Sequence, residues 1–161
     1  MRALVVYYSR TGNTRKVARF IASKLAAEFE EIVDTKKRQG VLGWIGAGRD
    51  AMLHRETPIG PVQKDPASYD LVVIGSPIWA GNVAAPVRTY LVQYGRRARR
   101  VAFFLTMKGQ GEAKVLDDMA QIVGKTPFDK LVVRSCEVAD GSFAKGAAGF
   151  AAKLTGAFGV A

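Results

Sequence analysis

Apolar runs alternate along the chain with segments of helical periodicity. Runs rich in β-branched and aromatic residues predict strong strands over 2–8, 70–75, 100–106 and 130–136, and a weaker strand is predicted over 31–35. Between them, apolar side chains recur at three- and four-residue spacing, which predicts helices over 13–29, 84–94, 112–124 and 142–158. The strong strands are apolar throughout, as expected when helices cover both faces of a parallel sheet. The pattern therefore predicts an α/β fold, a three-layer, doubly wound, five-stranded parallel sheet.

The 161 residues are predicted to form one domain, 1–161, because no repeat or Pro/Gly/Ser-rich linker divides them. One segment, residues 36–60, is too long for an ordinary connection between strands. It contains Trp44, and a short helix is predicted near 47–54. We expect a functional insertion here, and we interpret His54 as an ordinary polar residue.

The composition limits which membrane segments, disulfides and metal sites the chain is expected to have. Hydrophobic residues make up 48% of the chain, yet no run of about 18 apolar residues predicts a membrane span. The apolar stretch from Ala3 to Tyr8 is too short for a signal peptide, so a cytoplasmic location is predicted. The single cysteine, Cys136, excludes an intrachain disulfide and is expected to be a small buried residue at the end of a strand. With one histidine, no zinc site or Cys–His nucleophile pair is expected, and no metal site is predicted.

The formal net charge of +10 predicts attraction to anionic partners. Two denser basic runs, residues 36–38 and 96–100, are interpreted as solvated turns, with a docking patch as the alternative. Nucleic acid is not favoured as a partner, and a monomer or weak homodimer is expected.

The first candidate loop follows the first predicted strand and opens the first predicted helix. It consists of Ser9, Arg10, Thr11, Gly12, Asn13 and Thr14. Free N–H groups and the helix dipole favour a phosphate here, and the hydroxyls can donate to its oxygens. A helix N-cap made by Thr11 or Asn13 is the alternative. No Gly-Lys-Ser/Thr P-loop is present, so a nucleoside triphosphatase is not expected.

Two further candidate loops also follow strong predicted strands. The second, residues 75–82, contains the candidate site residues Ser76, Pro77, Ile78, Trp79, Ala80 and Gly81. An aromatic ring at this place can stack on a planar ligand, or it can pack beneath the 36–60 segment. The third loop contributes Thr106, Met107, Gly109 and Gly111, whose glycines allow backbone N–H groups to approach a polar ring edge.

In this order and spacing, Ser9-Arg10-Thr11-Gly12-Asn13-Thr14, Gly-Ser-Pro-Ile-Trp-Ala-Gly at 75–81 and the glycine-rich loop at 106–111 resemble the flavodoxin family. The resemblance covers nearly the whole chain and looks like the short-chain form. It implies strand order 2-1-3-4-5 and FMN as cofactor, with phosphate in the first loop and the isoalloxazine ring between the other two. It also implies that Trp79 flanks the ring. The 36–60 insertion departs from the family pattern and is a candidate lid, with Trp44 as a second stacking residue.

The resemblance implies an FMN-dependent redox protein that transfers electrons between protein partners. Flavodoxin carriers are usually acidic, whereas this chain is basic, which predicts acidic partners and argues against a very low potential. The alternative is an FMN-dependent NAD(P)H or quinone reductase, or an enzyme resembling flavodoxin-like protoporphyrinogen oxidase. A binding module without redox use is the third hypothesis. No general acid, base or nucleophile group is evident, so no catalytic side chain is predicted.

Overall fold

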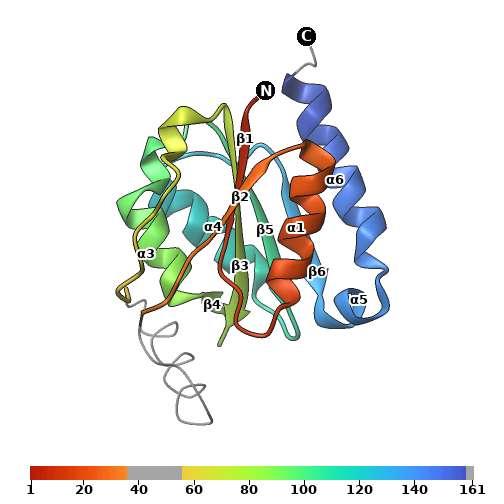
Figure 1. The fold of residues 1–161 in the computed structure, drawn as a ribbon. Helices are drawn as coiled ribbons and strands as arrows, with labels where there is room; N and C mark the ends of the chain where they lie inside the picture. Colours follow the sequence, from red (N-terminus) through yellow and green to blue (C-terminus); the bar gives the residue numbers. More distant parts are fainter. Residues whose placement is uncertain (36–55, 159–161) are drawn as a thin grey trace.

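The structure is a computed structural model that describes residues 1–35 and 56–158. Trp44, His54, the short helix predicted near 47–54 and the basic run at 36–38 lie outside the described residues. The ribbon in Figure 1 shows a central sheet between two layers of helices.

Five strands form the parallel sheet, in the order β2-β1-β3-β5-β6. Their bounds are β1 Ala3–Tyr7, β2 Glu28–Glu31, β3 Leu71–Trp79, β5 Val101–Met107 and β6 Lys130–Arg134. Counted without the short strand β4 (Asn82–Val83), this is the predicted order 2-1-3-4-5. Strand β4 was not predicted; it pairs antiparallel with the end of β3 and makes a hairpin.

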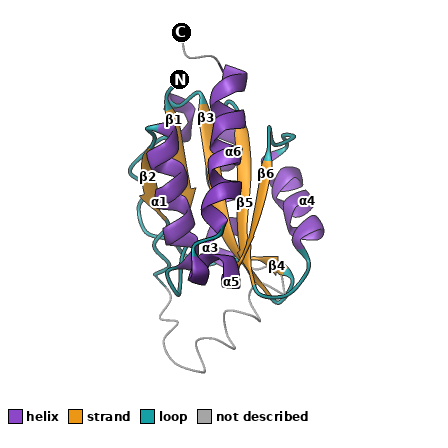
Figure 2. Cartoon of the chain, turned by 90° about the vertical axis from the view of Figure 1, so that its right-hand side faces the viewer, coloured by secondary structure: helices purple, strands orange, loops and turns teal. Residues whose placement is uncertain are grey.

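The helices form the outer layers, as Figures 1 and 2 show. One face of the sheet is covered by α3 (Ala85–Gln93) and α4 (Glu112–Val123), and the other by α1 (Asn13–Leu25), α5 (Ser135–Asp140) and α6 (Phe143–Phe158). Two short 3₁₀ turns, η1 (Pro66–Ser68) and η2 (Gly95–Arg97), precede β3 and β5. The α/β class and the three layers are therefore confirmed.

The sheet separates two hydrophobic cores because alternate side chains of each strand point to opposite faces. In β1, Leu4 and Val6 pack toward α3 and α4, whereas Val5 and Tyr7 pack toward α1 and α6. All residues of β1 and β5 are buried, which explains why their sequences lack polar alternation.

The predicted boundary between the first helix and the second strand is wrong. Helix α1 ends at Leu25 instead of residue 29, and β2 covers Glu28–Glu31 instead of 31–35. Ala26 adopts a left-handed conformation with φ of 47° and ends the helix. Strand β2 lies at the sheet edge, where its glutamates remain accessible, so its charged sequence gave little indication of a strand.

Three further expectations are corrected. Strand β3 continues past residue 75 to Trp79, so much of the predicted second loop is strand. Cys136 lies in helix α5 and is exposed, not buried at a strand end. Strand β6 ends at Arg134, because the chain turns into α5 directly afterwards.

Residues 56–65 lead the chain back to the sheet. Thr57 N donates to Thr89 Oγ1 over 2.9 Å, and Thr89 Oγ1 donates to the Thr57 carbonyl over 2.8 Å. Within the described residues, no helix is long and apolar enough to cross a membrane. The same part of the chain contains no group of three or more metal-ligating side chains.

Candidate functional site

The three candidate loops meet at the carboxyl edge of the sheet. Loop 9–14 follows β1, the β3–β4 hairpin carries residues 76–82, and the third loop follows β5. In doubly wound sheets, ligands bind at this edge, where the strand order reverses between β1 and β3. The lower part of Figure 1 shows this edge of the sheet, away from the N-terminus and the end of α6.

The first loop presents an uncapped helix N-terminus. Gly12 is the N-cap of α1 and has φ of 97°, a conformation that side chains rarely adopt, and no side chain caps the helix. The alternative N-cap by Thr11 or Asn13 is therefore not formed. No acidic residue lies in the first turn of α1 to complement the positive end of its dipole. These features leave the N-terminus open to an external anion.

The polar groups of this loop retain free donors. Gly12 N donates to Ser9 Oγ over 3.1 Å, so the hydroxyl proton of Ser9 remains free to donate elsewhere. Ser9 is buried, Arg10 and Asn13 are half-buried, and Thr11 is exposed. Arg10 Nη1 is buried and has no hydrogen-bond partner among the described residues. A buried donor without a partner costs about 1–3 kcal/mol, which an anion near the loop would offset.

A buried hydrogen bond joins the first and third loops. Thr14 Oγ1 and Thr106 Oγ1 lie 2.8 Å apart although 92 residues separate them in sequence. Their residues are 2% and 4% exposed. Whichever hydroxyl donates in this pair, the other keeps its own proton for a further acceptor.

The β3–β4 hairpin carries the aromatic residue of the site. Trp79, the last residue of β3, is half-buried and meets Tyr8 edge to face, with ring centroids 5.4 Å apart and an interplanar angle of 88°. Ala80 and Gly81 form the tip with positive φ. The near-perpendicular contact with Tyr8 fixes the orientation of the indole at the end of β3.

Sequence reasoning missed the residues that hold this hairpin. Asn82 is 4% exposed; its Nδ2 donates to the Ala80 carbonyl over 2.8 Å, and its Oδ1 accepts from Lys114 Nζ over 2.5 Å. Lys114 lies on α4, so this bond connects the hairpin to the helix after the third loop. We call these contacts the Asn82 clamp. No pattern in the sequence indicates that residues 32 positions apart would pair.

The hairpin and the third loop also touch directly. A Cβ at Gly111, where φ is 107°, would lie 3.2 Å from Gly81 Cα, so the close approach requires glycine. Ser76 is fully buried, and its hydroxyl donates to the Pro77 carbonyl and accepts from Ala84 N. Ser76 thus closes the base of the hairpin with contacts inside the chain.

The third loop is held from the side of β6. Arg134 Nη1 donates to the Gly109 carbonyl over 3.3 Å, and Ser135 Oγ donates to the Met107 carbonyl over 3.2 Å. Lys108, Gly109 and Gln110 are exposed, whereas Thr106 and Met107 are buried as the last residues of β5. The loop therefore presents a basic, polar tip on a fixed base.

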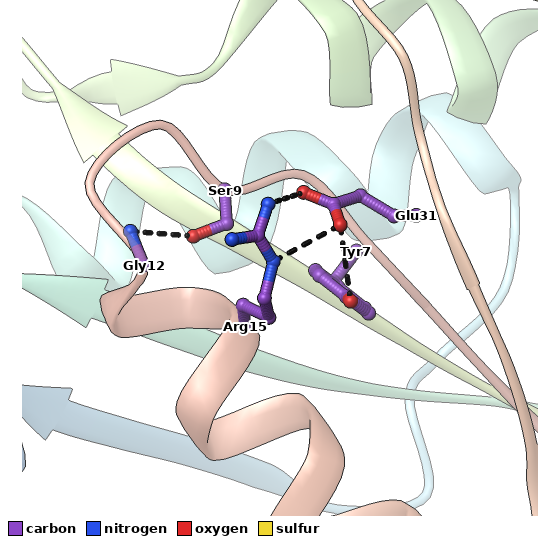
Figure 3. Close-up of polar contacts among 5 residues, drawn as sticks. All are labelled: Tyr7, Ser9, Gly12, Arg15 and Glu31. Atoms are coloured by element: carbon purple, nitrogen blue, oxygen red, sulfur yellow. Dashed lines mark hydrogen bonds and ion pairs between the residues drawn. The ribbon is translucent and has the colours of Figure 1, made fainter.

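A charged cluster secures the start of α1 to the ends of β1 and β2 (Figure 3). Arg15 holds Glu31 with two bonds, Nε to Oε2 at 3.1 Å and Nη2 to Oε1 at 2.7 Å, and Tyr7 Oη donates to Glu31 Oε2 over 3.3 Å. Burial and the adjacent Glu31 carboxylate raise the pKa of Tyr7, whereas Arg15 lowers it. Since Glu31 neutralises Arg15, that arginine anchors the loop and contributes little free charge to it.

The structure thus brings together residues from all three predicted loops. Hydrogen bonds within the chain already involve the hydroxyls of Ser76, Thr14 and Thr106. Arg10 carries a buried donor without a partner among the described residues. Pro77 and Ile78 are half-buried residues of strand β3. Along this edge the strand order β1-β3-β5 places loop 9–14 first, the hairpin with its indole next, and the third loop last.

Known structures share this fold. No protein-family model matches the chain. A flavoprotein from Lactobacillus acidophilus NCFM, solved in complex with FMN, is 26% identical with a TM-score of 0.71, over 88% of this chain and 98% of that one. Oxidised flavodoxin 2 from Bacillus cereus is 15% identical with a TM-score of 0.60, over 95% of this chain and 97% of that one.

A longer protein contains the same fold. Rubredoxin oxygen:oxidoreductase from Desulfovibrio gigas is 17% identical with a TM-score of 0.51, and the match covers 96% of this chain but 37% of that protein. At this identity the likeness concerns the fold alone. By its strand order, its layers and these structural neighbours, the chain is a flavodoxin-like protein.

Proposed function

We propose that this chain binds FMN at the carboxyl edge of its sheet and transfers electrons between protein partners. The observation that carries the proposal is the uncapped N-terminus of α1, joined by the Thr14–Thr106 hydrogen bond to the loop beside the Trp79 hairpin. The FMN complex of the Lactobacillus flavoprotein, with the same fold, supports the choice of cofactor.

The residues of loop 9–14 fit the phosphate of FMN. Ser9 has a hydroxyl proton to donate, the first-turn amides of α1 lack side-chain caps, and Gly12 leaves the approach clear because a Cβ there would meet nothing within 4 Å. Arg10 supplies a positive charge whose buried Nη1 needs an acceptor. Helix N-termini with such donors bind phosphates without a P-loop lysine.

The hairpin and the third loop fit the flavin ring. The hairpin places the half-buried indole of Trp79 beside the ring site, and Gly109 leaves the backbone of the other loop open, because a Cβ there would meet nothing within 4 Å. FMN supplies one- and two-electron redox chemistry when bound. The chain's own residues bind the phosphate, orient the ring and set the charge around it.

The charge of the chain supports acidic redox partners. Lys108 and Arg134 lie at the exposed tip and side of the third loop, beside the proposed ring site. One charge at about 10 Å in water contributes only about 0.4 kcal/mol, so several aligned charges are needed to affect docking or potential. The proposal includes a cytoplasmic location, where the exposed thiol of Cys136 would remain reduced.

Anaerobic reduction of the FMN-loaded protein, followed by its visible spectrum, tests the proposal. A carrier should be reduced in two separate one-electron steps and should re-oxidise on mixing with an acidic redox protein. Failure to retain FMN would contradict the proposal as a whole. Reduction in one two-electron step would contradict the carrier function while leaving FMN binding intact.

A reductase is the second candidate, because the third loop bears no aromatic side chain. The loop carries Met107, Lys108, Gly109 and Gln110, none of them aromatic. Within the described residues, no ring is contributed by this loop to cover the second flavin face. An open face would admit a nicotinamide or quinone, and Lys108 would favour an anionic substrate. Rapid reduction by NADPH supports this candidate, and its absence at millimolar NADPH excludes it.

A further inference from the structure

A second cleft lies at the opposite edge of the sheet from the proposed flavin site. It has a volume of about 770 Å³ and is lined chiefly by Arg99, Arg100, Lys125, Thr126, Phe128 and Phe158. These residues come from the start of β5, the turn after α4 and the end of α6. That end of the sheet is the upper one in Figure 1, where the N-terminus and the end of α6 lie. The volume falls within the range of small-molecule sites, about 300–1,000 Å³.

The cleft is cationic. Three of its lining residues carry positive charge and none carries negative charge. One of the three cations is already paired, since Arg99 Nη1 lies 3.7 Å from Asp70 Oδ1, and the carboxylate of Asp129 lies 3.5 Å from Lys153 Nζ, outside the cleft. Neither Arg100 nor Lys125 forms an ion pair within residues 1–35 and 56–158. Two cations are therefore available to an anionic group.

The cleft is also aromatic. The Arg100 guanidinium lies over the Phe158 ring, with Cζ 4.8 Å from the ring centroid, and the Phe128 and Phe158 centroids are 4.8 Å apart at 56°. An arginine stacked on a ring keeps the N–H groups at its edge for a phosphate or carboxylate. Phe128 is 49% exposed, although it is a large apolar side chain.

The walls of the cleft are fixed by the backbone. Phe128 N donates to the Val101 carbonyl over 2.7 Å, and Lys125 Nζ donates to the Arg96 carbonyl over 2.9 Å. The backbone of Phe128 is thus held against the start of β5. A preformed site loses less conformational entropy on binding than a flexible one.

We infer that this cleft binds a nucleotide, with its base against Phe128 and its phosphate at Arg100 and Lys125. A simple anion would use the cations but not the exposed ring, and an acidic peptide would not require an aromatic wall. A base stacked on an aromatic side chain together with a phosphate held by arginine uses both features. This inference is independent of the proposed function, because the cleft shares no residue with the flavin site.

Amide chemical shifts of the protein, measured with added FMN to occupy the flavin site, test the inference. ADP should cause saturable shifts at Arg100, Lys125 and Phe128, and inorganic phosphate or adenosine alone should bind at least about tenfold more weakly. Arg100→Gln should weaken ADP about tenfold and Phe128→Ala about fivefold, from the usual contributions of a charged hydrogen bond and a stacked base. Lys130→Gln, an exposed cation outside the cleft, is the matched control and should change ADP binding by less than about twofold.

Three results would overturn the inference. The first is no saturable shift at millimolar ADP, and the second is an equal loss in Lys130→Gln, which would indicate nonspecific attraction. The third is binding of a glutamate-rich peptide at these residues when ADP does not bind. Because the amide shifts of the cleft residues are measured separately from those of loop 9–14, a failure to bind ADP can be distinguished from a failure to bind FMN.

Discussion

Replacing Asn82 by alanine removes both side-chain hydrogen bonds of the Asn82 clamp. The bond to the Ala80 carbonyl joins neutral groups and is worth about 1 kcal/mol, and the bond from Lys114 involves a charge and is worth about 1.5–3 kcal/mol. Lys114 is exposed and regains water when the bond is lost, so the lower end of its range applies. We expect Asn82→Ala to lower the free energy of unfolding by about 2–3 kcal/mol.

The same change should affect the flavin site through Trp79. Ala80 is held at φ of 46°, a conformation that costs an L-residue about 1–2 kcal/mol, and the clamp keeps it there. Without the clamp the hairpin relaxes and the indole loses its fixed place. Because aromatic stacking contributes about 0.5–1.5 kcal/mol beyond burial, FMN affinity should fall by up to about tenfold.

Thermal unfolding and FMN titration measure these two effects. A loss of 2–3 kcal/mol should lower the Tm by about 4–12 °C in a chain of this length. Lys114→Met is the matched control: it keeps the Asn82–Ala80 bond and should have about half the effect on Tm. A double-mutant cycle with Trp79→Leu tests the route. If Asn82→Ala weakens FMN binding equally with and without Trp79, the clamp does not act through the indole, and an unchanged Tm would refute the energetic reasoning.

Further predictions concern other parts of the chain. Gly12→Ala adds no clash, since nothing lies within 4 Å of the new Cβ, but its φ of 97° should cost about 1–2 kcal/mol and weaken FMN binding. Gly124→Ala, at φ of 71° with the same open surroundings, should cost as much stability while leaving FMN affinity unchanged; equal affinity losses in both variants would contradict the role of loop 9–14. Tyr90→Phe should stabilise the protein by about 1 kcal/mol in urea unfolding, because Tyr90 Oη is buried without a hydrogen-bond partner in the described part of the chain; a loss of stability would show that the hydroxyl has one. Burial raises the pKa of Tyr90 above its ordinary value of about 10, so the native state resists its deprotonation; stability should decline as pH rises beyond about 10 in the wild type and less steeply in Tyr90→Phe.

The sequence predicts the fold well where burial is complete. Strands β1 and β5 are buried at every residue, so their apolar runs are unambiguous, and the amphipathic helices α1 and α4 begin where expected. The prediction of strands fails where the position of a strand in the sheet, and not burial, determines its residue types. Strand β2 is charged because it lies at an edge, and Pro77 indicates a turn although β3 continues through it. Beyond Gly75, strand β3 pairs with β5 but no longer with β1, so the missing N–H of proline is tolerated there.

The candidate loops were predictable because each follows a strong strand, but their supports were not. The Thr14–Thr106 bond, the Asn82–Lys114 bond and the Arg134–Gly109 bond join residues 92, 32 and 25 positions apart. Such contacts depend on how strands and helices are placed relative to one another, and local sequence patterns do not indicate that placement. Cys136 shows the same limit, because an apolar strand pattern cannot reveal that a helix begins one residue earlier.

Titration of the protein with FMN and, separately, with riboflavin tests the central claim most directly. Quenching of protein fluorescence and the shift of the flavin spectrum report binding. If loop 9–14 binds the phosphate and the Trp79 hairpin binds the ring, FMN should bind at one per chain, and riboflavin should bind at least about tenfold more weakly, the usual worth of a charge-assisted hydrogen bond. Equal binding of both flavins would contradict the phosphate site, and binding of neither would contradict the assignment of this sheet edge to a flavin.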